Sequence, residues 1–517
     1  MTKNKICYSS PIQVEGKNMR IIHIAAEFAP IAKAGGLGEV VTGLCRQLSL
    51  QHEEVEIIIP KYGFIPDHLL QNLTKEKFEF PCLEASRFHA NTMWSAKVEN
   101  CQLHLLETDH PSGYFQRPQI YGYPDDLAKF LYFSKAALEY LKLRGEKIDI
   151  LHLHEWHTAL CAPLVKEEMA QQLQVRSVIF TIHNLEYQGK CVPKDLDSLG
   201  IIGKKYLQPS RLQDNVHADT LNLLKGAIVY SDAITTVSPT YAQEILTPHF
   251  GCHLQQTLLQ NKQKLQGILN GIDQKLWDPS KDPSIKAHVS ADDSLMQIEQ
   301  AKTANKMVLA KKFGLDMAKR PWIGAVTRLV PQKGPELLEE ALHYTIQSEG
   351  VFLLLGSSPI DSIQEHFEAL KKRYKDHPQV LIQLDYDEPL AHQIYAALDF
   401  TMIPSHFEPC GLTQLISMRY GTIPIVRSTG GLKDTVLDYD DYKVPNASRN
   451  GFTFSNPKEL QAVLQRAFAL QKRDLDSFHS LMKRAMQRDS SWKKPAAAYR
   501  QLYLTHVPEA RQPLYSI

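Results

Sequence analysis

Short runs of β-branched and other apolar residues alternate with helix-like stretches along the first half of the chain. The apolar runs begin at Ile21, Val55, Ile148, Val178 and Ala233. Between two of them, in DDLAKFLYFSKAALEYL, apolar residues recur every three or four positions, as on the buried face of a helix. Strands that alternate with helices are typical of a mostly parallel sheet covered by helices. The pattern therefore predicts an α/β domain.

A second series of strands and helices follows a polar, irregular stretch at residues 278–294. Its apolar runs are WIGAV, VFLLLG, VLIQL, FTMIP and PIVRS, and residues 457–503 read as helical. The chain therefore divides into two doubly wound α/β domains. The expected segments are a flexible extension at 1–18, a first domain at 19–275, a second domain at 276–490, and a helical tail at 491–517 that packs back on the first domain.

The composition of the 517-residue chain argues against large charged partners. Its 58 basic and 57 acidic residues give a net charge of +1, whereas proteins that bind nucleic acids or anionic membranes carry a basic excess. Eight cysteines without a C-x-x-C pair favour a reducing compartment. No early apolar run resembles a signal peptide, and either Met1 or Met19 could be the start. We expect a cytoplasmic protein with a neutral or small anionic ligand.

Ligands of parallel sheets bind beyond the carboxyl ends of the strands, so polar segments just after strands are the candidate sites. The first such segment contains Lys33, Gly35, Gly36 and Glu39 and opens a predicted helix. Glycines at a helix start allow a phosphate or sugar to reach backbone N–H groups, and Lys33 would add a positive charge. The glycine spacing matches neither the P-loop nor the dinucleotide fingerprint, so a plain strand-to-helix turn is equally well supported.

The segment His152-Leu-His154-Glu155-Trp156-His157 follows a second strand. Its histidines suggest a metal site, but alternate strand residues share a face, which leaves His157 out of register with the other two. Glu155 and Trp156 suit a sugar better, because a carboxylate accepts hydroxyl protons and an aromatic ring packs on sugar C–H groups. A buried tryptophan beside structural histidines is an equal alternative.

The next strand of the first domain ends in Thr181-Ile-His183-Asn184. Polar side chains at this point would converge on the space between the two domains. His183 and Asn184 would hold sugar hydroxyls or a developing oxocarbenium centre. A single histidine at a strand end is more often structural, so both interpretations stay open.

Two basic residues, Arg328 and Lys333, follow the first strand of the second domain. Arginine neutralises a diphosphate through a forked pair of donors and lysine as a point charge, which departure of a nucleoside diphosphate requires without a metal. A solvated surface pair is the alternative. Triplets such as Asp385-Tyr386-Asp387 would suit magnesium, but they arise by chance among 57 acidic residues. We predict no metal.

The segment PSHFEPCGLTQL, residues 404–415, is dense in glycine, proline and polar residues and precedes a predicted helix. Glu408 is placed to hold a ribose or sugar hydroxyl, and Gly411-Leu412-Thr413 would open the helix toward a phosphate. Cys410 has no base nearby, so a structural role is favoured over a nucleophilic one. Packing alone explains this composition poorly.

These segments together resemble one known family, the bacterial glycogen synthases and plant starch synthases of glycosyltransferase family 5. The likeness rests on KAGGLG, HEWH, FTIHNLEYQG, GILNGID, TRLVPQKG, PSHFEPCGLTQL and STGGLKDTV, and runs from about Met19 to Tyr503. It implies a GT-B fold, in which two Rossmann-like domains face each other across a cleft. It also implies transfer of glucose from ADP-glucose to the non-reducing end of an α-1,4-glucan, glycogen or a malto-oligosaccharide. Configuration would be retained, without metal or cofactor.

The resemblance also implies roles for individual residues. Lys33, Gly35 and Gly36 would meet the donor phosphates, and Tyr386 would pack against adenine. The residues expected at the catalytic centre are His183, Arg328, Lys333 and Glu408. Those expected to bind substrate are Lys33, Gly35, Gly36, Glu39, Glu155, Asn184, Asn270, Tyr386, Cys410, Gly411, Leu412 and Thr413. The segment at 270–279 is a hinge candidate, because the two domains must close around the donor.

Four positions depart from the commoner family pattern. Glu39 and Glu155 replace aspartates, His406 replaces an arginine, and Asp385 stands where a glycine is usual. UDP-glucose therefore stays an alternative donor. A catalytically weak, glucan-binding or regulatory homologue is the alternative outside enzymes. The sequence does not indicate oligomeric state, effectors or primer length.

Overall fold

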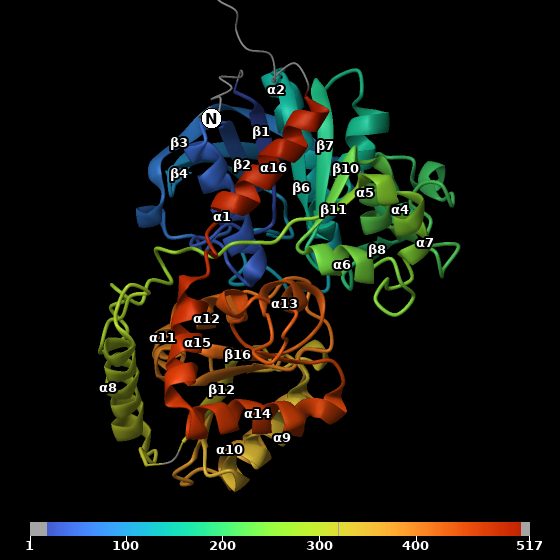
Figure 1. The fold of residues 1–517 in the computed structure, drawn as a ribbon. Helices are drawn as coiled ribbons and strands as arrows, with labels where there is room; N and C mark the ends of the chain where they lie inside the picture. The colour runs from blue at the N-terminus through green and yellow to red at the C-terminus, as the bar shows by residue number, and fades with distance from the viewer. Residues whose placement is uncertain (1–17, 319, 508–517) are drawn as a thin grey trace, which may run out of the picture.

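The computed structural model describes residues 18–318 and 320–507 and folds into two α/β domains (Figure 1). The α/β class is confirmed. Except for Asn18, the expected extension at 1–18 lies outside the described residues, as do residues 508–517 of the expected tail. No helix in the described part of the chain is long and apolar enough to cross a membrane.

The first domain is built on a nine-stranded sheet with the order β11-β10-β7-β6-β1-β2-β5-β4-β3. The strands from β11 to β5 are parallel, as their near-continuous apolar runs predict, whereas β4 pairs antiparallel with both β5 and β3. A separate two-stranded sheet joins β8 (Lys190–Cys191) and β9 (Leu221–Asn222). The strands of the large sheet are β1 (Arg20–Ile24), β2 (Glu54–Pro60), β3 (Gln71–Glu84), β4 (Arg87–Val98), β5 (Cys101–Thr108), β6 (Ile148–His154), β7 (Val175–Ile182), β10 (Ala233–Thr236) and β11 (Leu265–Gly267).

Helices connect these strands, and the helix predicted from DDLAKFLYFSKAALEYL is present as α2 (Asp126–Arg144). It buries the predicted apolar stripe and ends at Gly145, whose φ of 63° is left-handed. The other helices of this domain are α1 (Gly36–Leu50), α3 (Cys161–Pro163), α4 (Pro193–Ser198), α5 (Leu223–Tyr230), α6 (Pro239–Glu244) and α7 (Gln255–Gln260).

The second domain has a fully parallel six-stranded sheet with the order β14-β13-β12-β15-β16-β17. Its strands are β12 (Trp322–Val326), β13 (Val351–Leu355), β14 (Val380–Gln383), β15 (Phe400–Ile403), β16 (Ile423–Arg427) and β17 (Phe452–Phe454). Its helices are α8 (Leu295–Phe313), α9 (Pro335–Gln347), α10 (Asp361–Arg373), α11 (Glu388–Ala397), α12 (Thr413–Arg419), α13 (Gly430–Thr435), α14 (Leu460–Arg473) and α15 (Leu475–Gln487).

The last described helix, α16 (Lys493–His506), crosses from the second domain back to the first and lies along α1 (Figure 1). Gly43 of α1 allows this approach, because a Cβ there would lie 2.0 Å from the Trp492 ring. Arg500 pairs with the buried Glu53, and the Tyr503 hydroxyl lies 2.7 Å from His152 Nδ1. The last described helix thus packs on the same sheet that contains β1, the first described strand.

Helices α6 and α13 join the two domains next to the carboxyl ends of their sheets. Asp434 accepts hydrogen bonds from the backbone and hydroxyl of Thr240, at 2.8 and 2.6 Å. Glu244 accepts the Gly430 N–H at 3.0 Å and the Thr429 hydroxyl at 3.1 Å. The loops after the strands of one domain therefore face those of the other.

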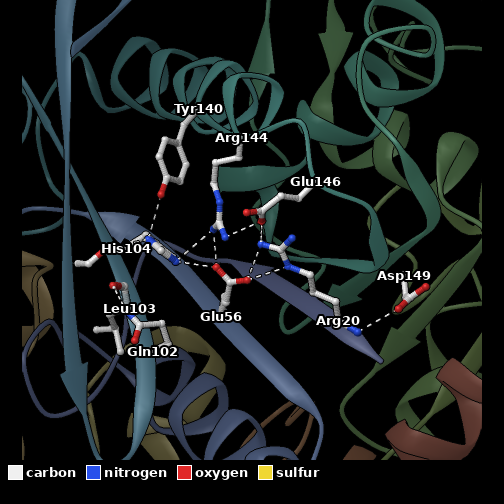
Figure 2. A network of polar contacts seen from close by, with 10 residues as sticks. Arg20, Glu56, Gln102, Leu103, His104, Tyr140, Arg144, Glu146 and Asp149 are labelled. Atoms are coloured by element: carbon white, nitrogen blue, oxygen red, sulfur yellow. Dashed lines mark hydrogen bonds and ion pairs between the residues drawn. The ribbon is translucent and has the colours of Figure 1, made fainter. Parts of the chain in front are cut away.

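The opposite, amino end of the first sheet carries a network of charged side chains (Figure 2). Glu56 accepts hydrogen bonds from Arg20 at 2.7 and 2.9 Å, from His104 at 2.7 Å, and from Arg144. Although burial acts to raise the pKa of Glu56, His104 and Arg144 hold it well below its usual range. Glu146 pairs with both arginines. Each charge in this network has an opposite partner.

Candidate active site

In the loop after β1, some of the backbone N–H groups already donate hydrogen bonds to a side chain of the same loop. Glu27 is buried and accepts the N–H groups of Ala34 and Gly35, at 2.8 and 3.0 Å. Those donors are therefore occupied, and only the N–H groups from Gly36 onward remain at the start of α1. Lys33 Nζ lies 2.5 Å from Glu39. Although burial acts to lower the pKa of Lys33, Glu39 raises it, so Lys33 keeps its positive charge as the partner of Glu39.

Glu155 holds the segment after β7 by its backbone. One carboxylate oxygen accepts the N–H groups of His183 and Asn184, at 2.6 and 2.7 Å, and the other accepts that of Trp156 at 3.3 Å. Glu155 has a φ of 65°, a left-handed conformation that costs a non-glycine residue about 1–3 kcal/mol. Burial raises its pKa to about 7. Its expected contact with substrate stays a prediction, whereas these bonds give it a positioning role.

The half-buried His183 ring contacts a cluster of buried imidazoles. His183 Nε2 lies 3.1 Å from His154 Nδ1, and His154 Nε2 lies 3.0 Å from His23 Nδ1. His152 bonds instead to the hydroxyls of Tyr503 and Thr181. Burial lowers the pKa of all four histidines, so the rings are neutral at physiological pH.

This cluster revises the set of histidines in the metal hypothesis. Ring nitrogens of His23, His152 and His154 lie within 4.8 Å of one another, whereas His157 packs against Tyr121 with ring centroids 4.9 Å apart. Both nitrogens of His152 and of His154 already have hydrogen-bond partners. A metal would have to displace these bonds, and the predicted absence of metal stays a prediction.

In the second domain, the loop after β12 meets the loop after β15. Lys333 Nζ lies 2.5 Å from Glu408, which also accepts the Ser405 hydroxyl at 2.9 Å. Gly334 has a φ of 65°, and a Cβ there would lie 2.8 Å from the carbonyl of Pro404, so glycine permits this approach. Glu408 and Lys333 are thereby fixed as a pair.

Arg328 lies in the same loop, and its side chain is exposed. None of the carboxylates that the structure describes forms an ion pair with it. Unlike Lys333, it is therefore an uncompensated positive charge. A guanidinium in this state is suited to bind an oxyanion through a forked pair of hydrogen bonds.

Two glycines of α13 bring the STGGL segment against the EPCG segment. A Cβ at Gly430 would lie 2.0 Å from the carbonyl oxygen of Glu408, and one at Gly431 would lie 2.1 Å from that of Cys410. The Cys410 thiol is buried, which raises its pKa to about 12 and leaves no nucleophilic thiolate at neutral pH. Asn270 contacts Cys410, and its buried Oδ1 has no hydrogen-bond partner. Asn270 is therefore a candidate to bind a ligand donor.

Residues of both domains meet at the start of α1. Leu412, just before α12, lies 3.5 Å from the position of a Cβ on Gly36. Tyr386 is 77% exposed, bonds to Glu388 at 3.2 Å, and lies close enough to Lys33 for their charges to interact. The structure thus brings Lys33, Leu412 and Tyr386 close together, and their expected contacts with phosphate and adenine stay a prediction. Thr413 is the first residue of α12, beside them.

Sequence reasoning assigned no role to Glu27, His23 or Glu244. Glu27 lies three residues after the first strand ends and is a buried carboxylate on the glycine loop. His23 lies opposite His152 in the pairing of β1 with β6, which no pattern within one segment indicates. Glu244 joins the domains across 186 residues of chain. Of these three residues, only Glu27 has a local signal in the sequence, because it lies shortly after the first strand.

Comparisons with known proteins agree with this arrangement. Residues 20–260 match the starch synthase catalytic domain family, and residues 310–478 match the group 1 glycosyl transferases. Sucrose-phosphate synthase from Thermosynechococcus elongatus shares the fold at 18% identity, with a TM-score of 0.58 over 95% of this chain and 100% of that one. The fold and these family matches define a two-domain glycosyltransferase of the GT-B class.

Closer relatives narrow this class. The chain is 44% identical to the glycogen synthase of Protochlamydia amoebophila over 94% of this chain and 99% of that protein. It is 45% identical to probable starch synthase 4 of Arabidopsis thaliana, but spans only 47% of that longer protein. The catalytic domain of Arabidopsis starch synthase IV, bound to ADP and acarbose, has a TM-score of 0.90 at 44% identity, covering 95% of this chain and 100% of that one. The chain belongs to the family of bacterial glycogen synthases and plant starch synthases.

Proposed function

We propose that this glycogen or starch synthase transfers glucose from ADP-glucose to the non-reducing end of an α-1,4-glucan and retains the anomeric configuration. The observation that carries the proposal is that the glycine loop of Lys33 meets Leu412 and Tyr386 of the second domain, whose neighbouring loop carries Arg328 and, paired with Glu408, Lys333. A nucleoside diphosphate is the leaving group that such a set of charges stabilises. The related starch synthase IV structure was bound to ADP and acarbose, which supports this choice of ligands.

The proposed step is departure of the diphosphate and attack of the acceptor hydroxyl from the same face. Arg328 and Lys333 stabilise the charge that develops on the leaving diphosphate. A double displacement would need a free carboxylate beneath the anomeric carbon. Glu27, Glu155 and Glu408 each accept hydrogen bonds from neighbouring groups, so they are engaged in holding the site. Retention through a front-face step fits this arrangement.

The choice of ADP-glucose over UDP-glucose rests on Tyr386 and on the family. The exposed Tyr386 ring offers a flat face on which a purine stacks more extensively than a pyrimidine. His406, which replaces the family's arginine, has both ring nitrogens engaged: Arg427 lies 2.7 Å from Nδ1, and Glu336 lies 2.6 Å from Nε2. It therefore offers the nucleotide no free donor, and we assign it no part in donor choice.

The test is glucose incorporation into glycogen by the purified protein, with ADP-glucose or UDP-glucose supplied in parallel under excess chelator. We expect incorporation from ADP-glucose at a rate that chelator does not change. Faster transfer from UDP-glucose would overturn the donor assignment. Binding of glycogen without transfer from either donor would instead favour a binding or regulatory role.

A further inference from the structure

Three imidazoles form a continuous chain from the candidate active site into the core of the first domain. His183 Nε2 meets His154 Nδ1 at 3.1 Å, and His154 Nε2 meets His23 Nδ1 at 3.0 Å. His154 and His23 are fully buried, whereas His183 is half-buried. Among the described residues, His183 Nδ1 has no hydrogen-bond partner, so this nitrogen is free to meet a ligand.

The protons along this chain cannot be placed independently. A neutral imidazole carries one N–H and one bare nitrogen, and burial lowers the pKa of His23 and of His183 to about 3. Each of the two hydrogen bonds needs one proton. If His154 donates to His183, its other nitrogen must accept from His23. If His154 accepts from His183, it must donate to His23.

His23, at the buried end of the row of imidazoles, distinguishes between these two arrangements of the protons. His23 Nε2 is buried without a hydrogen-bond partner. When protons point toward His23, this nitrogen carries an N–H that donates to nothing, which is rare and costly inside a protein. When protons point toward His183, Nε2 is a bare lone pair, which proteins leave unpaired more often. The second order leaves the proton of His183 on Nδ1.

We propose that His154 and His23 are positioning residues that hold His183 as the Nδ1–H tautomer, so that it presents a hydrogen-bond donor to a hydroxyl oxygen of the bound sugar. The identity of that ligand as a sugar rests on the proposed function, whereas the tautomer itself does not. In this form Nδ1 has no lone pair to accept a proton. His183 therefore acts on the substrate as a neutral donor and not as a general base.

His152 provides a matched control within the same cluster. Its ring stacks on that of His154 at 4.2 Å between centroids, and it is equally buried. Its nitrogens bond to hydroxyls, Tyr503 at 2.7 Å and Thr181 at 2.6 Å, and not to the chain of imidazoles. Replacing His152 therefore disturbs the packing of the cluster without changing the bond to His183.

The test is nitrogen NMR of the full-length protein labelled with ¹⁵N-histidine, which distinguishes protonated from bare ring nitrogens. The signals of His183 are identified by their loss in His183→Gln. We expect His183 to carry its proton on Nδ1 in the absence of any ligand. A proton on Nε2 of His183 would overturn the proposal. Because this measurement needs no turnover, it stands even if glucose transfer is not found.

Variants of His154 test whether the bond holds the tautomer. In His154→Phe, which cannot donate, we expect the Nδ1–H form of His183 to lose its dominance and kcat to fall about tenfold, with little change in KM. His154→Asn places an amide N–H near the position of Nδ1 and should restore the tautomer. His152→Phe should leave it unchanged. Persistence of the Nδ1–H form in His154→Phe would contradict the proposal, and if that variant does not fold, the wild-type spectrum decides.

Discussion

The two ends of the first sheet differ in how completely their polar side chains are paired. At the amino end, Glu56 lies between Arg20 and Arg144, and each charge has a partner within hydrogen-bonding distance (Figure 2). At the carboxyl end, His154 and His183 are neutral, and nitrogens of the histidine cluster remain unpaired. The amino end is electrostatically complete, whereas the carboxyl end has hydrogen-bonding capacity left for a ligand.

This difference indicates which end of the first sheet can bind a ligand. A carboxylate with three partners gains nothing from a further ligand, so the amino end contributes to stability alone. The buried, unpaired Asn270 Oδ1 at the carboxyl end reduces stability but can be satisfied by a substrate, and the exposed Arg328 guanidinium of the second domain is likewise free to bind one. Substitutions at the two ends should therefore separate stability from activity.

The largest effect is expected from Arg328→Ala and Lys333→Ala. Each removes a positive charge from the leaving diphosphate, so kcat should fall about a hundredfold or more. The unfolding temperature should change little for Arg328→Ala, because no carboxylate of the described structure pairs with it. Initial rates with ADP-glucose measure the effect, and Lys372→Ala, an exposed lysine of α10, is the control. Normal turnover in both variants would refute the assignment.

Glu56→Gln should lower the stability of the protein and leave kcat nearly unchanged. It leaves Arg20 and Arg144 without their shared carboxylate, which should cost about 3 kcal/mol of stability. Because the folded pKa of Glu56 is depressed, its contribution is present above pH 4.5 and is lost as the pH falls, so wild type and variant should converge in acid. Thermal unfolding at several pH values measures this. A large loss of kcat at 25 °C in the folded variant would contradict the separation of the two ends.

Glu155→Gln should alter the pH dependence of the reaction. The carboxylate that holds His183 and Asn184 has a pKa of about 7, so the wild-type rate should rise as the pH increases through 7. A glutamine oxygen can still accept both N–H groups but does not titrate, so this acid limb should disappear with a few-fold loss of kcat. A pH–rate profile from 5 to 9 tests this, and an unchanged limb in the variant would assign the titration to another group.

The same variant gives a stability test of opposite sign to that of Glu56. Burial raises the pKa of Glu155 from 4.5 to about 7, so protonation favours the folded state below pH 4.5, and that contribution is lost as the pH rises through 7. Wild type should therefore lose stability relative to Glu155→Gln between pH 5 and 8. Parallel unfolding midpoints across that range would be inconsistent with the raised pKa.

The smallest effect is expected from His406→Arg, which introduces the residue that the family resemblance leads us to expect there. His406 is occupied by Arg427 and Glu336, so we expect less than about a threefold change in the ratio of rates with ADP-glucose and UDP-glucose. A reversal of donor preference would show that this position contacts the nucleotide. The matched substitution Asp385→Gly tests the other departure from the family beside Tyr386.

Sequence patterns predicted the buried strands and α2 because each is continuous in the chain and strongly apolar. They did not predict the antiparallel edge, since β3 alternates irregularly and its first half is mostly exposed. The contact of Lys333 with Glu408 spans 75 residues, so only the fold could show it. The position of Glu155 after a strand and the family resemblance both placed it in the site, but its bonds to backbone N–H groups depend on a left-handed conformation that no side-chain pattern reveals.

The measurement that tests the central claim most directly is proton NMR of the glucan during the reaction with ADP-glucose, with chelator present. The anomeric signal of the donor should decrease while that of new α-1,4 linkages grows at the same rate. Arg328→Ala should show the same product at about one hundredth of the rate. Formation of β linkages, or release of free glucose without growth of the glucan, would contradict retaining transfer at the meeting of the two domains.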